Sequence, residues 1–266
     1  MNLLTLGSLA SGIGGLDLAV EAVFDTIPIW HAEYDKYADS VYSQHWNTPN
    51  LGDITKIDWS VIERPDILCG GYPCQPFSQV GLRKGEDDER NLWPYFARAI
   101  RALRPNIVVL ENVAAHLRLG FGRVLGDLAE AGYDAEWGVF RASDVGAPHR
   151  RERIFIVAYT DGYETPIDPI GQGFQRQSDT RQGRFDFRDF GAAIRRWEFE
   201  MNESAPYPMQ GKRVNPDFAR WMMGYPTGWT HGSQTQQLKM IGNAVVPQQG
   251  EFAIRHLLAR ANKEGE

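Results

Sequence analysis

The sequence predicts an α/β fold: a mainly parallel sheet covered by helices on both faces, followed by a small irregular module. Over the first 160 residues, short apolar runs alternate with stretches in which apolar residues recur at helical spacing, as expected when strands and helices alternate. From residue 161 to about residue 208 the chain is rich in Gly, Gln, Arg, Asp and Pro, without sustained periodicity. We therefore expect one domain formed by residues 1–160 and 237–266, and a second formed by residues 161–236.

The individual elements follow from local patterns of apolar residues. Strands are expected at residues 3–7, 27–31, 66–69, 106–111, 133–141 and 153–159. Helices are expected at residues 15–24, 92–103 and 246–261, with another through Asp39, Val41 and Tyr42. Pro247 suits the first position of the last helix, and residues 237–247 are interpreted as a compact Gly-Asn turn before it. The strands at 133–141 and 153–159 are expected to pair like a hairpin at one edge of the sheet.

The composition is that of a soluble globular protein. Of 266 residues, 42% are hydrophobic and 23% are charged, which are ordinary values. No apolar run reaches membrane-spanning length, and the first five residues lack the basic region of a signal peptide. The two cysteines, Cys69 and Cys74, do not make a disulfide framework, and no histidines stand at zinc-ligand spacing. We expect a cytoplasmic protein without a metal site.

Charge is distributed unevenly along the chain. The formal net charge is −6, which argues mildly against a nucleic-acid partner. Residues 171–196, however, contain six arginines and three aspartates, so this stretch carries +3 and the remainder carries −9. A basic stretch on an acidic body is compatible with a confined DNA-binding face. The alternative is a solvated, partly flexible arginine-rich loop.

One cysteine stands in an unusual setting. Residues 70–78 read Gly-Gly-Tyr-Pro-Cys-Gln-Pro-Phe-Ser and directly follow the strand expected at 66–69. Cys74 lies between two prolines, which restrict the backbone around it. The carboxyl edge of a parallel sheet is where α/β enzymes place reactive groups. We interpret Cys74 as a nucleophile, with an unreactive loop cysteine as the alternative.

A glycine-rich turn follows the first strand and indicates a ligand site. Residues 11–15 read Ser-Gly-Ile-Gly-Gly, which lets the backbone approach a ligand at a helix N-terminus. The dinucleotide pattern requires glycine where this chain has Asp17, so NAD is the weaker interpretation. Glu33, at the end of the second strand, is placed to bind ribose hydroxyls, and Asp53 could accept from an adenine amino group. The alternative for each acid is a helix cap or a solvated charge.

Further candidates stand at the ends of later strands. Glu111 ends the strand expected at 106–111 and is a candidate acid, with a surface cap as the alternative. Arg151 and Arg153 would share one face of a strand by period-two alternation. Two adjacent guanidinium groups suit a phosphate or carbonyl oxygen, although a solvent-exposed basic segment is the alternative.

Taken in this order, these segments resemble the DNA (cytosine-5)-methyltransferase family. The resemblance covers residues 1–160 and 214–250, and its most specific parts are the Pro-Cys-Gln and Gly-Asn-Ala-Val elements. It implies a Rossmann-like S-adenosylmethionine-dependent methyltransferase sheet, with residues 161–236 as the target-recognition domain. It also implies methyl transfer to carbon-5 of a cytosine flipped out of a short specific duplex DNA site.

The same resemblance implies a role for each motif residue. Cys74 would attack carbon-6 of the ring, Glu111 would protonate nitrogen-3, and Arg151 with Arg153 would bind the base oxygen and a phosphate. The implied cofactor-binding residues are Ser11, Gly12, Ile13, Gly14, Gly15, Glu33, Tyr34, Asp53, Ile54, Asn243 and Val245. The candidate DNA-binding residues are Gln75, Ser78, Arg90, Arg176, Arg181, Arg184 and Arg188. Residues 79–90 would close over the flipped base.

The chain departs from the family pattern at Ala10, where an aromatic residue is usual, and at His149, where glutamine is common. The resemblance implies a monomer, with a cognate restriction endonuclease as a candidate partner. Two other functions stay open: a cytosine-5 methyltransferase acting on tRNA, and a non-catalytic DNA-binding relative.

Overall fold

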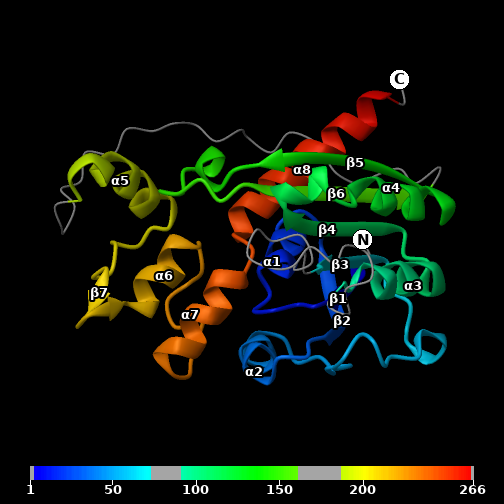
Figure 1. The fold of residues 1–266 in the computed structure, drawn as a ribbon, viewed down its shortest axis with the longest axis horizontal. Coiled ribbons are helices and arrows are strands. Elements are labelled where there is room, and N and C mark those ends of the chain that lie inside the picture. Colours follow the sequence, from blue (N-terminus) through cyan, green and yellow to red (C-terminus); the bar gives the residue numbers. More distant parts are fainter. Residues whose placement is uncertain (1–2, 73–90, 161–186, 265–266) are drawn as a thin grey trace.

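A six-stranded sheet forms the centre of the molecule (Figure 1). The computed structural model describes residues 3–72, 91–160 and 187–264. The strand order is β2-β1-β3-β4-β6-β5. The strands are β1 (Leu4–Leu9), β2 (Thr26–Ala32), β3 (Ile67–Gly71), β4 (Ile107–Val113), β5 (Tyr133–Phe140) and β6 (Arg153–Thr160). The first four are parallel, whereas β6 runs antiparallel to both β4 and β5. The predicted fold class and the edge hairpin are therefore confirmed.

Helices cover both faces of this sheet, because its strands are apolar on both sides. Helices α1 (Gly15–Glu21) and α8 (Pro247–Glu264) pack on one face, and α3 (Trp93–Leu103) and α4 (Phe121–Glu130) pack on the other. Strand β4 shows the alternation directly. Val108 and Leu110 join the core under α3 and α4, whereas Ile107 and Val109 join the core under α1 and α8.

A third apolar core lies beside the sheet. Its helices are α2 (Lys36–His45), α5 (Gly191–Glu200), α6 (Pro216–Met222) and α7 (Gln234–Asn243), with the short strands β7 (Met209–Gln210) and β8 (Arg213–Val214) nearby. Figure 1 shows α5, α6 and β7 set apart from the sheet, with α7 between them and α1. Trp197, Trp221 and Tyr225 are fully buried in this core, together with Ile13 from the glycine-rich turn. The later part of the chain thus packs directly against the first glycine-rich turn.

Two expectations about the second half of the chain are wrong. Residues 191–200 form α5 although the segment was expected to be irregular, because Ile194 and Trp197 supply one buried stripe of a helix. The expected turn at 237–247 is mostly α7, which begins with a capping box between Ser233 and Gln236. Only residues 244–246 connect α7 to α8. The predicted division of the chain at residue 237 therefore falls inside one helix.

Gly15 stands at the most crowded point of the glycine-rich turn. A Cβ on Gly15 would overlap the Tyr225 hydroxyl and lie 2.5 Å from the Val245 carbonyl oxygen. We expect Gly15→Ala to lower the free energy of unfolding by about 3 kcal/mol, as overpacking does elsewhere, in urea titrations. The matched control is Gly126→Ala in α4, where an added Cβ meets no atom within 4 Å. That variant should gain up to about 1 kcal/mol from helix propensity, and equal stability of the two variants would contradict the prediction.

Candidate active site and cofactor pocket

A cavity of about 790 Å³ lies at the carboxyl ends of the parallel strands. Its walls come from the turn after β1, from the residues after β2 and β3, from the end of β4, and from α7 with the segment that follows it. Ten of the predicted cofactor-binding residues line it: Ser11, Gly12, Ile13, Gly15, Glu33, Tyr34, Asp53, Ile54, Asn243 and Val245. The remaining one, Gly14, does not line it. Parallel α/β sheets bind ligands at this edge, and the volume suits a ligand of nucleoside size.

The glycine-rich turn takes a backbone path that side chains disfavour. The φ angles are 47° at Ala10, 56° at Gly12 and 80° at Gly14, all in the left-handed region. The turn closes when the Gly14 amide donates to the Ser11 carbonyl over 2.9 Å. The buried Ser11 hydroxyl has no hydrogen-bond partner among the described residues. Because it also lines the cavity, it can hydrogen-bond to a ligand there.

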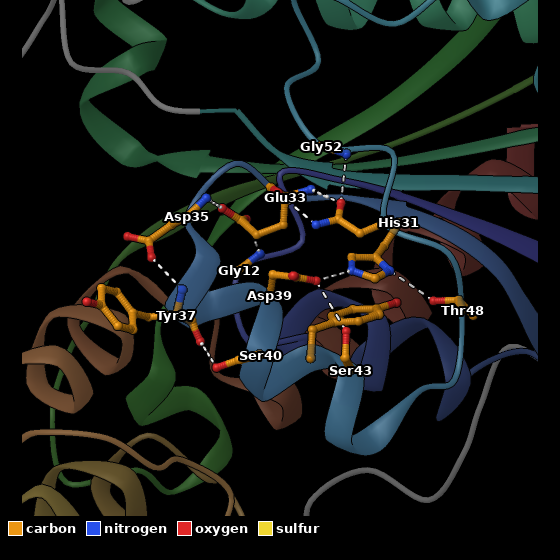
Figure 2. Close-up of polar contacts among 12 residues, drawn as sticks. Gly12, His31, Glu33, Asp35, Tyr37, Asp39, Ser40, Ser43, Thr48 and Gly52 are labelled. Carbon is orange, nitrogen blue, oxygen red and sulfur yellow. Dashed lines mark hydrogen bonds and ion pairs between the residues drawn. The ribbon is translucent and has the colours of Figure 1, made fainter.

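Glu33 follows β2 and ties the glycine-rich turn to the start of α2. Its Oε2 atom accepts from the Gly12 amide over 2.8 Å, and its Oε1 atom accepts from the Asp35 amide over 2.7 Å. Figure 2 shows these three residues side by side. Burial raises the pKa of Glu33, and the two amide hydrogen bonds oppose that shift. Each carboxylate oxygen can accept a further hydrogen bond.

Asp53 stands on the neighbouring wall of the cavity. Its Oδ1 atom accepts from the amide and hydroxyl of Thr55 over 3.0 and 2.8 Å, and its Oδ2 atom lies 3.3 Å from Lys56 Nζ. The Thr55 hydroxyl lowers the pKa of Asp53 most, helped by the Thr55 amide and Lys56. Asp53 therefore presents an ionised carboxylate that is already oriented by its own turn.

Glu111 and Arg153 form a largely buried ion pair on the wall of the cavity. The antiparallel pairing of β4 with β6 brings them together, and Arg153 Nε lies 2.9 Å from Glu111 Oε1. Their side chains are 12% and 18% exposed, and both residues line the cavity. Burial raises the pKa of Glu111, while Arg153 and Arg151 oppose the shift. A carboxyl group in this setting holds a proton more readily than an exposed one.

The expected common face of Arg151 and Arg153 is wrong. Arg151 lies before β6 and has a φ of 34°, so the strand alternation does not reach it. Its guanidinium donates to the carbonyl oxygens of Gly242 and Ala244 over 2.9 and 2.6 Å. Burial, followed by repulsion from Arg153, lowers the pKa of Arg151 to about 10. Arg151 thus holds the end of α7 beside the cavity and does not line it.

The predicted nucleophile and most predicted DNA contacts lie outside the described residues: Cys74, Gln75, Ser78, Arg90, Arg176, Arg181 and Arg184, as well as the expected closing loop at 79–90. Arg188 belongs to the helical turn Arg188–Phe190, and its side chain is not described. Tyr72 is the last described residue before the Pro-Cys segment. The Asn112 amide donates to the Tyr72 carbonyl oxygen over 2.9 Å, and the Tyr72 ring packs on Trp93 with centroids 5.2 Å apart. Gly71 and Tyr72 therefore lie beside the end of β4, which carries Glu111 and Asn112.

An ion pair at the edge of the cavity was not predicted from the sequence. Lys239 Nζ in α7 lies 2.9 Å from Asp35 Oδ2, and both residues line the cavity. Asp35 also caps α2 by accepting from the Tyr37 amide. Lys239 lowers the pKa of Asp35. The sequence shows an N-cap at Asp35, but no local signal links it to a lysine 204 positions away.

A second carboxyl group is buried beneath the glycine-rich turn. Asp17 has no exposed surface, and the Tyr42 hydroxyl donates to its Oδ1 atom over 2.9 Å. Burial raises the pKa of Asp17 to about 6, although hydrogen bonds from Ser8 and Tyr42 oppose the shift. The folded protein therefore favours the neutral acid. The contribution of Asp17 to the free energy of unfolding is fully present at pH values below its pKa in the unfolded chain. It is lost as the pH rises through its higher pKa in the folded protein.

We expect Asp17→Asn to remove this pH dependence. The asparagine keeps an acceptor for Tyr42 but cannot ionise. Between about pH 4 and pH 6 the wild type should lose roughly 3 kcal/mol relative to the variant, since one pKa unit corresponds to about 1.4 kcal/mol. Urea titrations of both proteins from pH 4 to pH 8 measure the difference. Parallel stability curves would show that Asp17 titrates as an ordinary carboxylate.

Comparison with known sequences gives a consistent family. The model of the C-5 cytosine-specific DNA methylase family matches residues 4–190. The chain is 32% identical over 285 residues to the type II methyltransferase M.NlaX of Neisseria lactamica, covering 89% of this chain and 90% of that protein. It is 40% identical over 156 residues to M1.ScrFI of Lactococcus lactis subsp. cremoris, covering 57% of this chain and 40% of that protein. The second alignment thus spans less than half of its relative.

Comparison with solved structures gives the same fold. The crystal structure of a Spodoptera frugiperda DNMT2 mutant matches with a TM-score of 0.71 at 17% identity, covering 96% of this chain and 99% of that one. The chain belongs to the C-5 cytosine-specific DNA methylase family and is a DNA (cytosine-5)-methyltransferase. Among its described helices, none is long and apolar enough to cross a membrane.

Proposed function

We propose that this methyltransferase binds S-adenosylmethionine in the cavity and modifies a cytosine flipped out of a short specific duplex DNA site. The observation that carries the proposal is the cavity itself. It brings Glu33, Asp53 and Glu111 together at the carboxyl edge of one sheet, and Tyr72 also lines it. This arrangement supports a site in which a nucleoside and a flipped base bind side by side.

The residues of the cavity fit this cofactor. Glu33 can accept hydrogen bonds from a ribose diol, and Asp53 can accept from an adenine amino group. The Ser11 hydroxyl, which has no partner among the described residues, can bind the amino acid part. The carboxylates on the walls also suit a ligand that carries a positive charge. When bound, S-adenosylmethionine supplies an electrophilic methyl group.

The protein's own contribution is to make carbon-5 of cytosine nucleophilic. The Cys74 thiolate adds to carbon-6, and Glu111 donates its proton to nitrogen-3, so that carbon-5 becomes electron-rich and accepts the methyl group. Loss of the proton from carbon-5 to solvent then expels the thiolate, and nitrogen-3 returns its proton to Glu111, which restores the neutral aromatic ring. The raised pKa of Glu111 supports its role as the proton donor. We assign Arg153 to orienting Glu111, and Arg151 to holding the segment beside Asn243.

The similarity to proteins named type II methyltransferases supports a role in restriction-modification. In that role the chain would protect a recognition site from a cognate restriction endonuclease. We propose residues 161–236 as the target-recognition domain of a monomeric, cytoplasmic enzyme. The arginines at 176, 181, 184 and 188 are candidates for reading guanine.

The test supplies the purified protein with radiolabelled S-adenosylmethionine and either plasmid DNA or total tRNA. We expect label in the DNA alone, and methylation-sensitive sequencing should place it on one cytosine within one short motif. An oligonucleotide duplex carrying 5-fluorocytosine at that position should become covalently attached to the protein. Label in tRNA but not in DNA would show that the substrate is tRNA and would overturn the proposed DNA substrate. If the protein bound DNA but gave neither label nor adduct, it would be a non-catalytic DNA-binding relative of the family.

A further inference from the structure

The side chain of Asn50 joins the two segments that carry the predicted nucleoside-binding acids. Asn50 Oδ1 accepts from the amide of Glu33 over 3.0 Å and from the amide of Gly52 over 2.8 Å. Asn50 Nδ2 donates to the carbonyl oxygen of Glu33 over 3.0 Å. One side-chain amide thus hydrogen-bonds to the backbone N–H and C=O groups of Glu33. It also bonds to the backbone N–H of Gly52, the residue that precedes Asp53. Figure 2 shows Gly52 and Glu33 facing each other across these bonds.

The segment that carries Asn50 is anchored independently of this side chain. His31 in β2 exchanges backbone hydrogen bonds with Pro49 and Leu51, over 3.1 and 2.7 Å. Its buried ring bonds to the Thr48 hydroxyl over 2.9 Å and to Asp39 over 2.9 Å (Figure 2). These contacts place residues 48–51 beside the end of β2 as a single parallel bridge. Loss of the Asn50 side chain therefore leaves the segment attached to the sheet.

The Asn50 side chain is exposed and does not line the cavity. It acts on the cavity through its neighbours. The Glu33 carboxylate accepts hydrogen bonds from the amides of Gly12 and Asp35. The backbone of Glu33 is hydrogen-bonded to the Asn50 side chain. Gly52, on the other side of Asn50, itself lines the cavity next to Asp53. The hydrogen bonds of Asn50 to Glu33 and Gly52 consequently set the distance between the segment that carries Glu33 and the segment that carries Asp53.

We propose that Asn50 is a positioning residue that fixes Glu33 and Asp53 at the separation of a ribose and an adenine. The proposal rests on the proposed S-adenosylmethionine site. A rigid pair of acids binds a nucleoside without first being ordered, so pre-positioning lowers the dissociation constant. Asn50 itself is not among the residues that line the cavity. It should therefore affect binding of the nucleoside cofactor and leave the chemical step unchanged.

The experiment compares Asn50→Ala with Asn50→Asp in the full chain. Asn50→Ala removes three hydrogen bonds, whereas Asn50→Asp keeps both acceptor bonds and loses only the donor to Glu33. The matched control is Asn215→Ala, which removes an amide that also accepts from one backbone amide and donates to one carbonyl, remote from the cavity. Calorimetric titration with S-adenosylhomocysteine measures affinity, and steady-state assays on DNA separate KM from kcat.

We expect Asn50→Ala to raise the dissociation constant and the KM for the cofactor about tenfold, with kcat at saturating cofactor within about twofold of the wild type. Asn50→Asp should bind the cofactor with an affinity between those of the wild type and Asn50→Ala. Asn215→Ala should match the wild type in its affinity for S-adenosylhomocysteine. A folded Asn50→Ala or Asn50→Asp protein with wild-type affinity overturns the role of Asn50 alone. A kcat that falls with an unchanged KM overturns it as well. Failure of the wild type to bind S-adenosylhomocysteine overturns the cofactor site itself.

Discussion

Cys74→Ala is expected to abolish the covalent adduct with 5-fluorocytosine DNA and to lower the rate of methyl transfer by on the order of 10⁴-fold or more. Carbon-5 of cytosine does not attack an electrophile unless carbon-6 has first gained a nucleophile. None of the described residues that line the cavity is a cysteine that could supply that bond instead. Binding of S-adenosylhomocysteine should be unchanged, since the cofactor residues lie on other segments of the chain.

The protein contains its own control for this experiment. Cys69 lies in β3 with no exposed surface, and burial raises the pKa of its thiol. Such a thiol stays protonated and out of reach of a substrate. Cys69→Ala should therefore keep both the adduct and methyl transfer at a temperature where it is folded. An adduct that survives in Cys74→Ala and disappears in Cys69→Ala would reverse the assignment, and gel analysis after trapping distinguishes the two.

Glu111→Gln is expected to lower kcat by about 10²- to 10³-fold, because glutamine fills the same space but cannot protonate nitrogen-3 of the ring. The pH dependence should identify the mechanism. Burial raises the pKa of Glu111, so the protonated fraction of the wild type falls as pH rises through that raised value. The ratio of wild-type to variant kcat should therefore decrease with increasing pH. Single-turnover rates at saturating DNA and cofactor measure it.

Glu152→Gln serves as the matched control for Glu111→Gln. Glu152 also pairs with an arginine, Arg141 at 2.9 Å, but its side chain is 41% exposed and does not line the cavity. Its loss should change kcat by less than about twofold, because exposed ion pairs contribute little. If the two substitutions lowered kcat equally, Glu111 would act by stabilising the pairing of β4 with β6 and not by donating a proton.

The sequence predicts the elements that obey local rules. Apolar runs separated by amphipathic stretches predict the sheet, and residues at strand ends must then meet at one edge. Glu33 and Glu111 do line one cavity for this reason. Ser233 and Gln236, spaced as a capping box, would also have predicted the start of α7.

Other features depend on contacts between distant parts of the chain. The stripe of Ile194 and Trp197 is too short to predict a helix, and α5 is stabilised by burial in the third core. Arg151 leaves the strand alternation because its guanidinium bonds to α7. The Asp35–Lys239 pair and the grip of Asn50 on Glu33 likewise arise only when the chain has folded. No periodicity within a segment encodes such contacts.

The cavity takes residues from both early and late parts of the chain, since Lys239, Asn243 and Val245 line it together with Ser11 and Glu33. During translation the glycine-rich turn leaves the ribosome long before α7 and α8 are synthesised. α1 meanwhile lacks α8, its packing partner in the sheet core. A growing polypeptide therefore lacks part of the cavity wall until α7 and the segment after it emerge. A chain that terminates before residue 239 should have no methyltransferase activity. An incompletely synthesised enzyme should therefore not methylate DNA.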